Sequence, residues 1–130
     1  KAIELALKNI DNNYNYVEKL NVLIKDKLKQ YKNVVINSRD NSLPFTINFS
    51  IKNVKSLKVV ESLEDKEIYV SAKTSCCPIE SPSKLVYALT KDKNIASTSV
   101  RISLSHLTKE EEATEFLQVF DGIYKKYYKD

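Results

Sequence analysis

The stretch that decides the fold is FTINFSI, residues 45–51, in which apolar and polar residues alternate strictly. The apolar positions are Phe45, Ile47, Phe49 and Ile51. Because successive side chains of a strand lie on opposite faces of its sheet, this period of two predicts a strand with one buried face. It is the clearest strand in the chain.

The chain before this strand is expected to be mainly helical. Residues 1–31 carry apolar side chains at helical spacing, and the polar run Asp11-Asn12-Asn13 interrupts them, which predicts two consecutive helical segments. The β-branched run at 33–38 predicts a short strand. Residues 39–42 then predict a polar turn, since Asp and Asn suit irregular backbone.

The chain after this strand alternates helices with short strands. The sequence predicts a helix over 56–63 and a strand at 68–70, followed by a polar loop at 71–80 that holds both cysteines. Ser81 and Pro82 are expected to open a further short helix, as N-cap and first helical residue.

The last third of the chain predicts a strand and a long terminal helix. Residues 99–104 alternate as a strand does, with Arg101 on the polar side, and an amphipathic helix follows Thr108. These patterns predict an α+β fold, a small sheet with helices packed on one face. No repeat or linker composition is present, so residues 1–130 are expected to form one domain.

Composition narrows the classes of function. The 130 residues are 42% hydrophobic and 29% charged, the balance of a folded globule, and the net charge is +4. The basic residues are mixed with acidic ones along the chain, so no concentrated basic face for nucleic acid is expected. No apolar run approaches the ~20 residues that a bilayer requires, so no membrane partner is expected. The chain opens at Lys1 without a start methionine or signal-peptide pattern, and we expect it to be a piece of a longer protein.

Two candidate groups carry chemistry. Cys76 and Cys77 are adjacent, so they cannot staple distant segments, and a reducing, cytoplasmic compartment is expected. In a small polar loop they are either functional thiols or free thiols without a role. With His106 as the only histidine, no zinc or other metal site is predicted. Arg101 is either a bidentate ligand for a carboxylate or one half of an ordinary surface ion pair.

Four stretches in order resemble the C-terminal small domain of a cysteine desulfurase of the NifS/IscS type, within the class V aminotransferases. They are PFTINFSI at 44–51, KEIYVSAKTSCC at 66–77, SPSKLVYAL at 81–89 and STSVRISLSHLTKEEEATEFL at 97–117. Their order and spacing match the family over nearly all of the chain. The resemblance implies the fold of the C-terminal domain of fold-type I pyridoxal-phosphate enzymes.

The same resemblance assigns roles to residues. It implies that Cys76 is the catalytic nucleophile that accepts sulfur as a persulfide, that Cys77 holds a place usually taken by serine, and that Arg101 binds the substrate's α-carboxylate. The family's large domain, which carries the Schiff-base lysine for pyridoxal phosphate, is absent from residues 1–130. No cofactor-binding residue is therefore assigned, and the fragment alone is expected to be inactive and to bind no cofactor.

The function implied by the resemblance is conversion of L-cysteine to L-alanine, with the sulfur carried to iron-sulfur cluster assembly or tRNA thiolation. The implied partners are the missing large domain, a second copy in a homodimer, and a sulfur-acceptor or scaffold protein. Alternatives are a related class V aminotransferase, a selenocysteine lyase, or a non-catalytic binding module. Direct binding of nucleic acid is not expected.

Overall fold

The computed structural model describes residues 1–72, 78 and 81–128 of the chain. Its three strands form one antiparallel sheet in the order β1-β2-β3. β1 is Val34–Ile36, β2 is Thr46–Ile51 and β3 is Ser99–Ser103. The strand predicted over 45–51 is confirmed as β2, and it lies between the other two.

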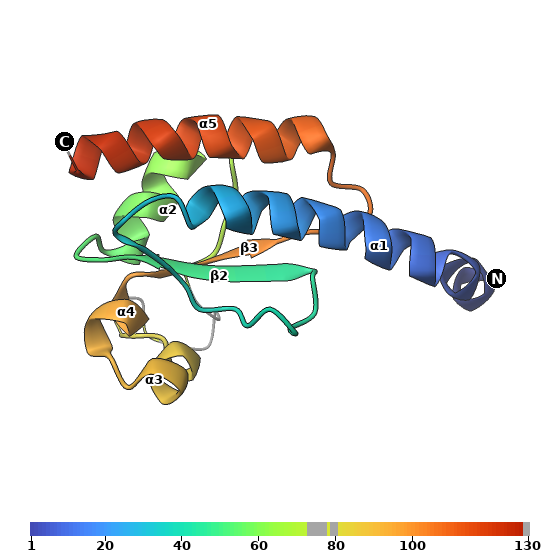
Figure 1. The fold of residues 1–130 in the computed structure, drawn as a ribbon, viewed down its shortest axis with the longest axis horizontal. Coiled ribbons are helices and arrows are strands. Elements are labelled where there is room, and N and C mark those ends of the chain that lie inside the picture. Colours follow the sequence, from blue (N-terminus) through green and yellow to red (C-terminus); the bar gives the residue numbers. More distant parts are fainter. Residues whose placement is uncertain (73–77, 79–80, 129–130) are drawn as a thin grey trace.

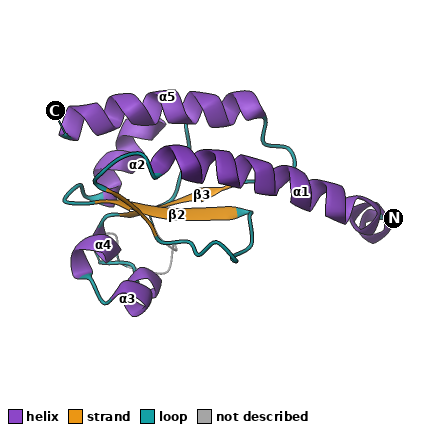
Figure 2. Cartoon of the chain, in the orientation of Figure 1, coloured by secondary structure: helices purple, strands orange, loops and turns teal. Residues whose placement is uncertain are grey.

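Three helices cover one face of the sheet, as Figures 1 and 2 show. They are α1, Ala2–Leu28; α2, Ser56–Glu64; and α5, Glu110–Tyr127. Their apolar side chains close over Ile47, Phe49 and Ile51 in a single buried cluster. The predicted α+β fold, a small sheet with helices packed on one face, is confirmed for these helices.

Two short helices lie on the other side of the sheet (Figure 1). α3 is Lys84–Thr90 and α4 is Lys93–Ser97, and Val86, Ile95 and Ala96 form a small apolar cluster of their own. α4 is held to the sheet through the fully buried Ser50, whose hydroxyl donates to the carbonyl of Ile95 at 2.8 Å. This side is therefore only partly covered, at the end where α4 docks.

The two N-terminal segments predicted from the sequence are one helix. α1 runs without a break through Asp11-Asn12-Asn13. Asn and Asp lower helix propensity by at most about 0.7 kcal/mol each relative to Ala, and a run of three does not end a helix whose later turns are anchored in the core. Residues 2–12 of α1 are exposed, and this end of the helix projects past the other elements (Figure 1).

The strand predicted at 68–70 is absent. The backbone N–H of Ile68 donates to the carbonyl of Leu63, so it closes the end of α2 rather than joining the sheet. Glu67 takes a left-handed φ of 59°, which turns the chain at this point. Pairing with the sheet begins only at Ser71, as a single antiparallel bridge to Arg101.

The short helix after the cysteine loop begins later than predicted. Ser81 donates its backbone N–H and its hydroxyl to the carbonyl of Pro78, at 3.0 and 2.8 Å, and so forms a turn. Ser83 takes the N-cap position instead, and its hydroxyl accepts from the N–H of Val86. None of the helices built from described residues is both long and apolar enough to cross a membrane.

Candidate active site

The central strands sort their side chains into one apolar and one polar face. On the core side Ile47 pairs with Ile102 and Phe49 with Val100. On the opposite side every paired position is polar: Thr46 with Ser103, Asn48 with Arg101, and Ser50 with Ser99. A polar sheet face beneath a partial helical cover is a place where a polar ligand can find partners.

A chain of hydrogen bonds crosses this polar face. The Nδ2 of Asn37 donates to the Oδ1 of Asn48 and to the Oγ of Ser50, both at 2.8 Å. The hydroxyl of Ser50 in turn donates a hydrogen bond to the backbone carbonyl of Ile95. The side chains of the face are thus oriented before any ligand arrives.

A cavity of about 540 Å³ opens on the same face. Its polar lining includes Asn37, Thr46, Asn48 and Arg101, and its apolar lining includes the exposed Leu43, Leu85 and Leu89. The volume is within the range of small-molecule sites. Both arginines of the sequence, Arg39 and Arg101, contribute to the lining, which favours an anionic ligand.

Arg101 has donor capacity to spare. Its Nε is buried and has no hydrogen-bond partner within the described part of the chain. The ion pairs among the described residues are Lys29 with Asp40 and Lys125 with Asp121, and neither involves Arg101. The reading of Arg101 as one half of a surface ion pair therefore finds no support among these residues.

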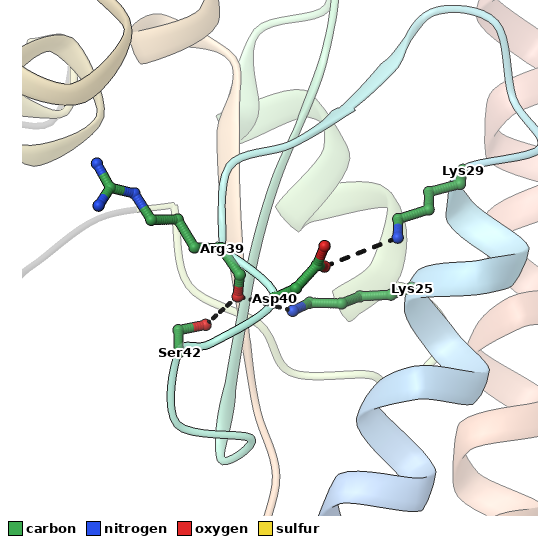
Figure 3. Close-up of polar contacts among 5 residues, drawn as sticks. All are labelled: Lys25, Lys29, Arg39, Asp40 and Ser42. Atoms are coloured by element: carbon green, nitrogen blue, oxygen red, sulfur yellow. Dashed lines mark hydrogen bonds and ion pairs between the residues drawn. The ribbon is translucent and has the colours of Figure 1, made fainter.

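Arg39 reaches the cavity from the turn before β2. Its backbone carbonyl accepts from the Nζ of Lys25 at 3.3 Å and from the hydroxyl of Ser42 at 2.6 Å, while Asp40 faces Lys29 at 3.8 Å. Figure 3 shows the guanidinium of Arg39 directed away from Lys25, Lys29 and Asp40. The backbone of Arg39 is thus held to α1 by Lys25, and the guanidinium of Arg39 can face the cavity.

The loop with the two cysteines starts at the other edge of β3. Ser71 and Arg101 exchange both backbone hydrogen bonds, at 3.0 and 2.6 Å. Arg101 thus has Asn48 on one side and the entry to the cysteine loop on the other. Cys76 and Cys77 themselves lie outside the described residues.

The groups with shifted pKa values lie elsewhere. Burial and the neighbouring Asp121 raise the pKa of Tyr31 to about 12, and the hydrogen bond from Lys125 lowers the pKa of Asp121. Burial also raises the pKa of Tyr128. All three side chains belong to the α5 side of the sheet, where Tyr31 stacks edge-on against Phe120 at 5.3 Å. They are structural groups.

The sequence singled out Arg101 but missed three residues of the same cavity: Asn37, Arg39 and Asn48. Alternation over 45–51 already places Asn48 on the polar face, which is the signal that could have found it. Nothing in the local pattern indicates Asn37 or Arg39, because the turn that carries them is positioned by α1. His106, which the sequence gave no role, is exposed in the turn after β3.

Comparison with known proteins identifies the family of this chain. The family model described as "Aminotransferase class-V" matches residues 1–116. The chain belongs to this family. A "Cysteine desulfurase IscS" from Dictyoglomus turgidum is 30% identical over 129 residues, which are 97% of this chain and 33% of the relative. A "NifS/IcsS protein homolog" from Lactobacillus delbrueckii is 34% identical over 88 residues, 66% of this chain and 23% of that protein.

Solved structures agree with the sequence comparisons. The crystal structure of a NifS-like protein from Rickettsia africae superposes with a TM-score of 0.80 at 30% identity, over 93% of this chain and 31% of that one. A sugar aminotransferase from Micromonospora echinospora has a TM-score of 0.66 at 13% identity, over 89% of this chain and 32% of that one, and so shares the fold alone. The chain spans a third or less of the curated relatives described above.

These findings confirm the resemblance to cysteine desulfurases of the NifS type and the α+β fold of a fold-type I pyridoxal-phosphate enzyme domain.

Proposed function

We propose that this chain is the small domain of a pyridoxal-phosphate-dependent cysteine desulfurase, in which Cys76 accepts the sulfur and Arg101 binds the substrate's α-carboxylate. The observation that carries the proposal is the bridge between Ser71 and Arg101, which joins the start of the cysteine loop to the arginine of the cavity. Both groups then act at one site.

Arg101 suits a carboxylate for two reasons. Among the described residues, none that lines its cavity is acidic, and none is a partner for its buried Nε. A planar guanidinium with free N–H groups binds a carboxylate through two parallel hydrogen bonds. The α-carboxylate of an amino acid meets both the charge and the geometry.

Cys76 suits the role of acceptor by reach and by chemistry. Cys76 is five residues after Ser71 in the sequence, so its Cα lies at most about 18 Å from that of Ser71. In the proposed step the Cys76 thiolate attacks the sulfur of L-cysteine, an S–S bond forms and the Cβ–S bond breaks. The electron pair of the broken bond stays on the substrate carbon, which takes up a proton and becomes L-alanine, and Cys76 is left as a persulfide.

The residues described here do not by themselves fit pyridoxal phosphate. The described residues that line the cavity with Arg101 include no lysine, and a Schiff base to the cofactor requires one. We therefore propose that a large domain binds the cofactor. The relatives are long enough to contain such a domain, since this chain spans a third or less of their length. When bound, pyridoxal phosphate acts as an electron sink for the substrate.

The exposed start of α1 fits contact with such a domain. Ile3, Leu5, Leu7 and Ile10 are 56–75% exposed. Apolar side chains gathered on a projecting helix mark an interaction surface. The proposal includes four further points about the whole protein. It forms a homodimer, it passes sulfur to an acceptor or scaffold protein, the sulfur serves iron-sulfur cluster assembly or tRNA thiolation, and the protein is cytoplasmic. Relatives include proteins named as mitosomal and mitochondrial cysteine desulfurases.

The test uses the full-length protein that carries this chain, incubated with L-cysteine and pyridoxal phosphate. Alanine and sulfide are measured, and the persulfide is trapped by alkylation and located by mass spectrometry. We expect Cys76→Ser to abolish alanine formation and Cys77→Ser, the matched control, to keep most of it. A persulfide on Cys77 alone, or alanine formation that survives in Cys76→Ser, would refute the assignment. The same assay separates the desulfurase from an aminotransferase, which forms no persulfide.

A further inference from the structure

We propose that Asn48 is a second substrate-positioning residue, whose side-chain amide donates a hydrogen bond to the same carboxylate that Arg101 binds, and that Asn37 fixes the direction of that amide. The inference rests on the proposed role of Arg101 and adds a residue to it. It is carried by the hydrogen-bond chain across the polar face of the sheet.

Asn48 and Arg101 are directly opposite each other on β2 and β3, and both line the cavity. Residues opposite each other in an antiparallel pair point to the same face, with Cβ atoms about 4.5–5.5 Å apart. This spacing lets an amide and a guanidinium reach the two oxygens of one carboxylate.

The direction of the Asn48 amide follows from a backbone carbonyl. The carbonyl of Ile95 can only accept, so Ser50 must donate to it. The Oγ of Ser50 must then accept the contact with Asn37, whose Nδ2 is therefore the atom at 2.8 Å. The second proton of that Nδ2 goes to Asn48, so the atom of Asn48 that faces Asn37 is Oδ1.

The consequence is that Asn48 presents its NH₂ group away from Asn37. No residue in the described part of the chain takes a hydrogen bond from this Nδ2, and Asn48 is only partly buried at the cavity. The arrangement also leaves the Oδ1 of Asn37 buried without a partner among described residues. Rotating the Asn37 amide would place its oxygen against two acceptors, Asn48 Oδ1 and Ser50 Oγ, so the observed orientation is kept although Asn37 Oδ1 has no partner among the described residues.

A donor pair of this kind distinguishes a carboxylate from an uncharged amide. Each oxygen of a carboxylate accepts, whereas a primary amide offers one acceptor and one NH₂ group. The NH₂ group of a bound amide would face either the Asn48 NH₂ or the Arg101 guanidinium, both donors. Asn48 is thus expected to add selectivity as well as affinity.

The experiment measures binding of L-alanine and of L-alaninamide to the full-length protein by calorimetry. The wild type is expected to prefer L-alanine. Asn48→Asp keeps the oxygen that accepts from Asn37 but replaces the donor by a second acceptor, so it should lower the preference about tenfold or more, the effect of one hydrogen bond to a charged group. Asn48→Ala should do the same, and Asn37→Ala should have a smaller effect because its loss frees the Asn48 amide to rotate.

Asn41→Ala is the matched control, because Asn41 lines the same cavity from the exposed turn and is on neither strand. Its preference should equal that of the wild type. An unchanged preference in Asn48→Asp, an equal loss in Asn41→Ala, or no preference in the wild type would each overturn the proposal. Thermal unfolding of each variant shows whether the fold is kept, and a structural role alone would shift the unfolding midpoint without changing the preference.

The test is independent of sulfur transfer. A protein that prefers L-alanine through Asn48 but forms no persulfide from L-cysteine would refute the proposed desulfurase and leave the positioning role standing. A protein that forms the persulfide while Asn48→Asp keeps the preference would do the reverse.

Discussion

Replacing Asn21 by Ala should loosen the link between α1 and the strand that carries the site. Asn21 is 5% exposed, and its Nδ2 donates to the backbone carbonyl of Pro44 at 2.8 Å, two residues before β2 begins. Pro44 is buried as well. The substitution leaves that carbonyl without this donor, at a cost of about 1–3 kcal/mol in the free energy of unfolding.

A second effect of the substitution works in the opposite direction. Ala favours a helix interior over Asn by about 0.5 kcal/mol, so the measured loss is smaller than the cost of the orphaned carbonyl. Asn15→Ala is the matched control, because Asn15 is exposed on the same helix and gains the same propensity without losing a buried hydrogen bond. The difference between the two variants should therefore be about 1–3 kcal/mol.

Urea denaturation of the 130-residue chain, followed by far-ultraviolet circular dichroism, measures this difference. The dependence on urea should keep the slope of the wild type, since the surface exposed on unfolding is unchanged. If the two variants differ by less than about 0.5 kcal/mol at equal slope, the contact between Asn21 and Pro44 does not stabilise the fold and the reasoning fails.

Two further predictions concern the cavity and the opposite side of the sheet. In the full-length protein Arg101→Lys keeps the charge but loses the two-pronged geometry, so the KM for L-cysteine should rise about tenfold or more with the unfolding midpoint unchanged; an unaltered KM would contradict the carboxylate role. The pKa of Tyr31 is raised to about 12, so the folded protein favours the neutral phenol. The contribution of this phenol to the free energy of unfolding is complete below about pH 10 and is lost between about pH 10 and 12. Tyr31→Phe should accordingly lose less stability than the wild type between pH 9 and 12 in urea titrations, and equal losses would contradict this.

Local pattern was enough to predict the elements whose two faces differ. Alternation located β2 and β3 because each has an apolar side facing the helices and a polar side facing away. The strand prediction was wrong at 68–70. Three residues are too few to show alternation, and the backbone N–H of Ile68 donates to the carbonyl of Leu63 at the end of α2. The continuity of α1 also escaped prediction, since its later turns are held by core contacts that local propensity does not include.

The candidate site could be predicted only in part, because its residues come from separate elements. Arg101 stood out as a strand arginine, and the resemblance raised Cys76. The pairing of Asn48 with Arg101 depends on the register between β2 and β3, which tertiary packing sets, since a slip of one residue would turn every side chain to the other face. The direction of the Asn48 amide depends in turn on Ile95, forty-five residues beyond Ser50 in sequence.

The pairing of β3 on both edges links the two proposed roles, carboxylate binding by Arg101 and sulfur acceptance by Cys76. Arg101 is fixed by backbone pairing on both sides, with Asn48 of β2 and with Ser71. A ligand that orients a substrate benefits from such rigidity, because a small displacement of the bound group lowers the rate. A sulfur acceptor has the opposite requirement, since it must reach the substrate and then deliver the sulfur elsewhere. The bridge at Ser71 suits the proposed pair of roles, because it holds the start of the cysteine loop against the arginine, and Cys76 follows five residues later in the sequence.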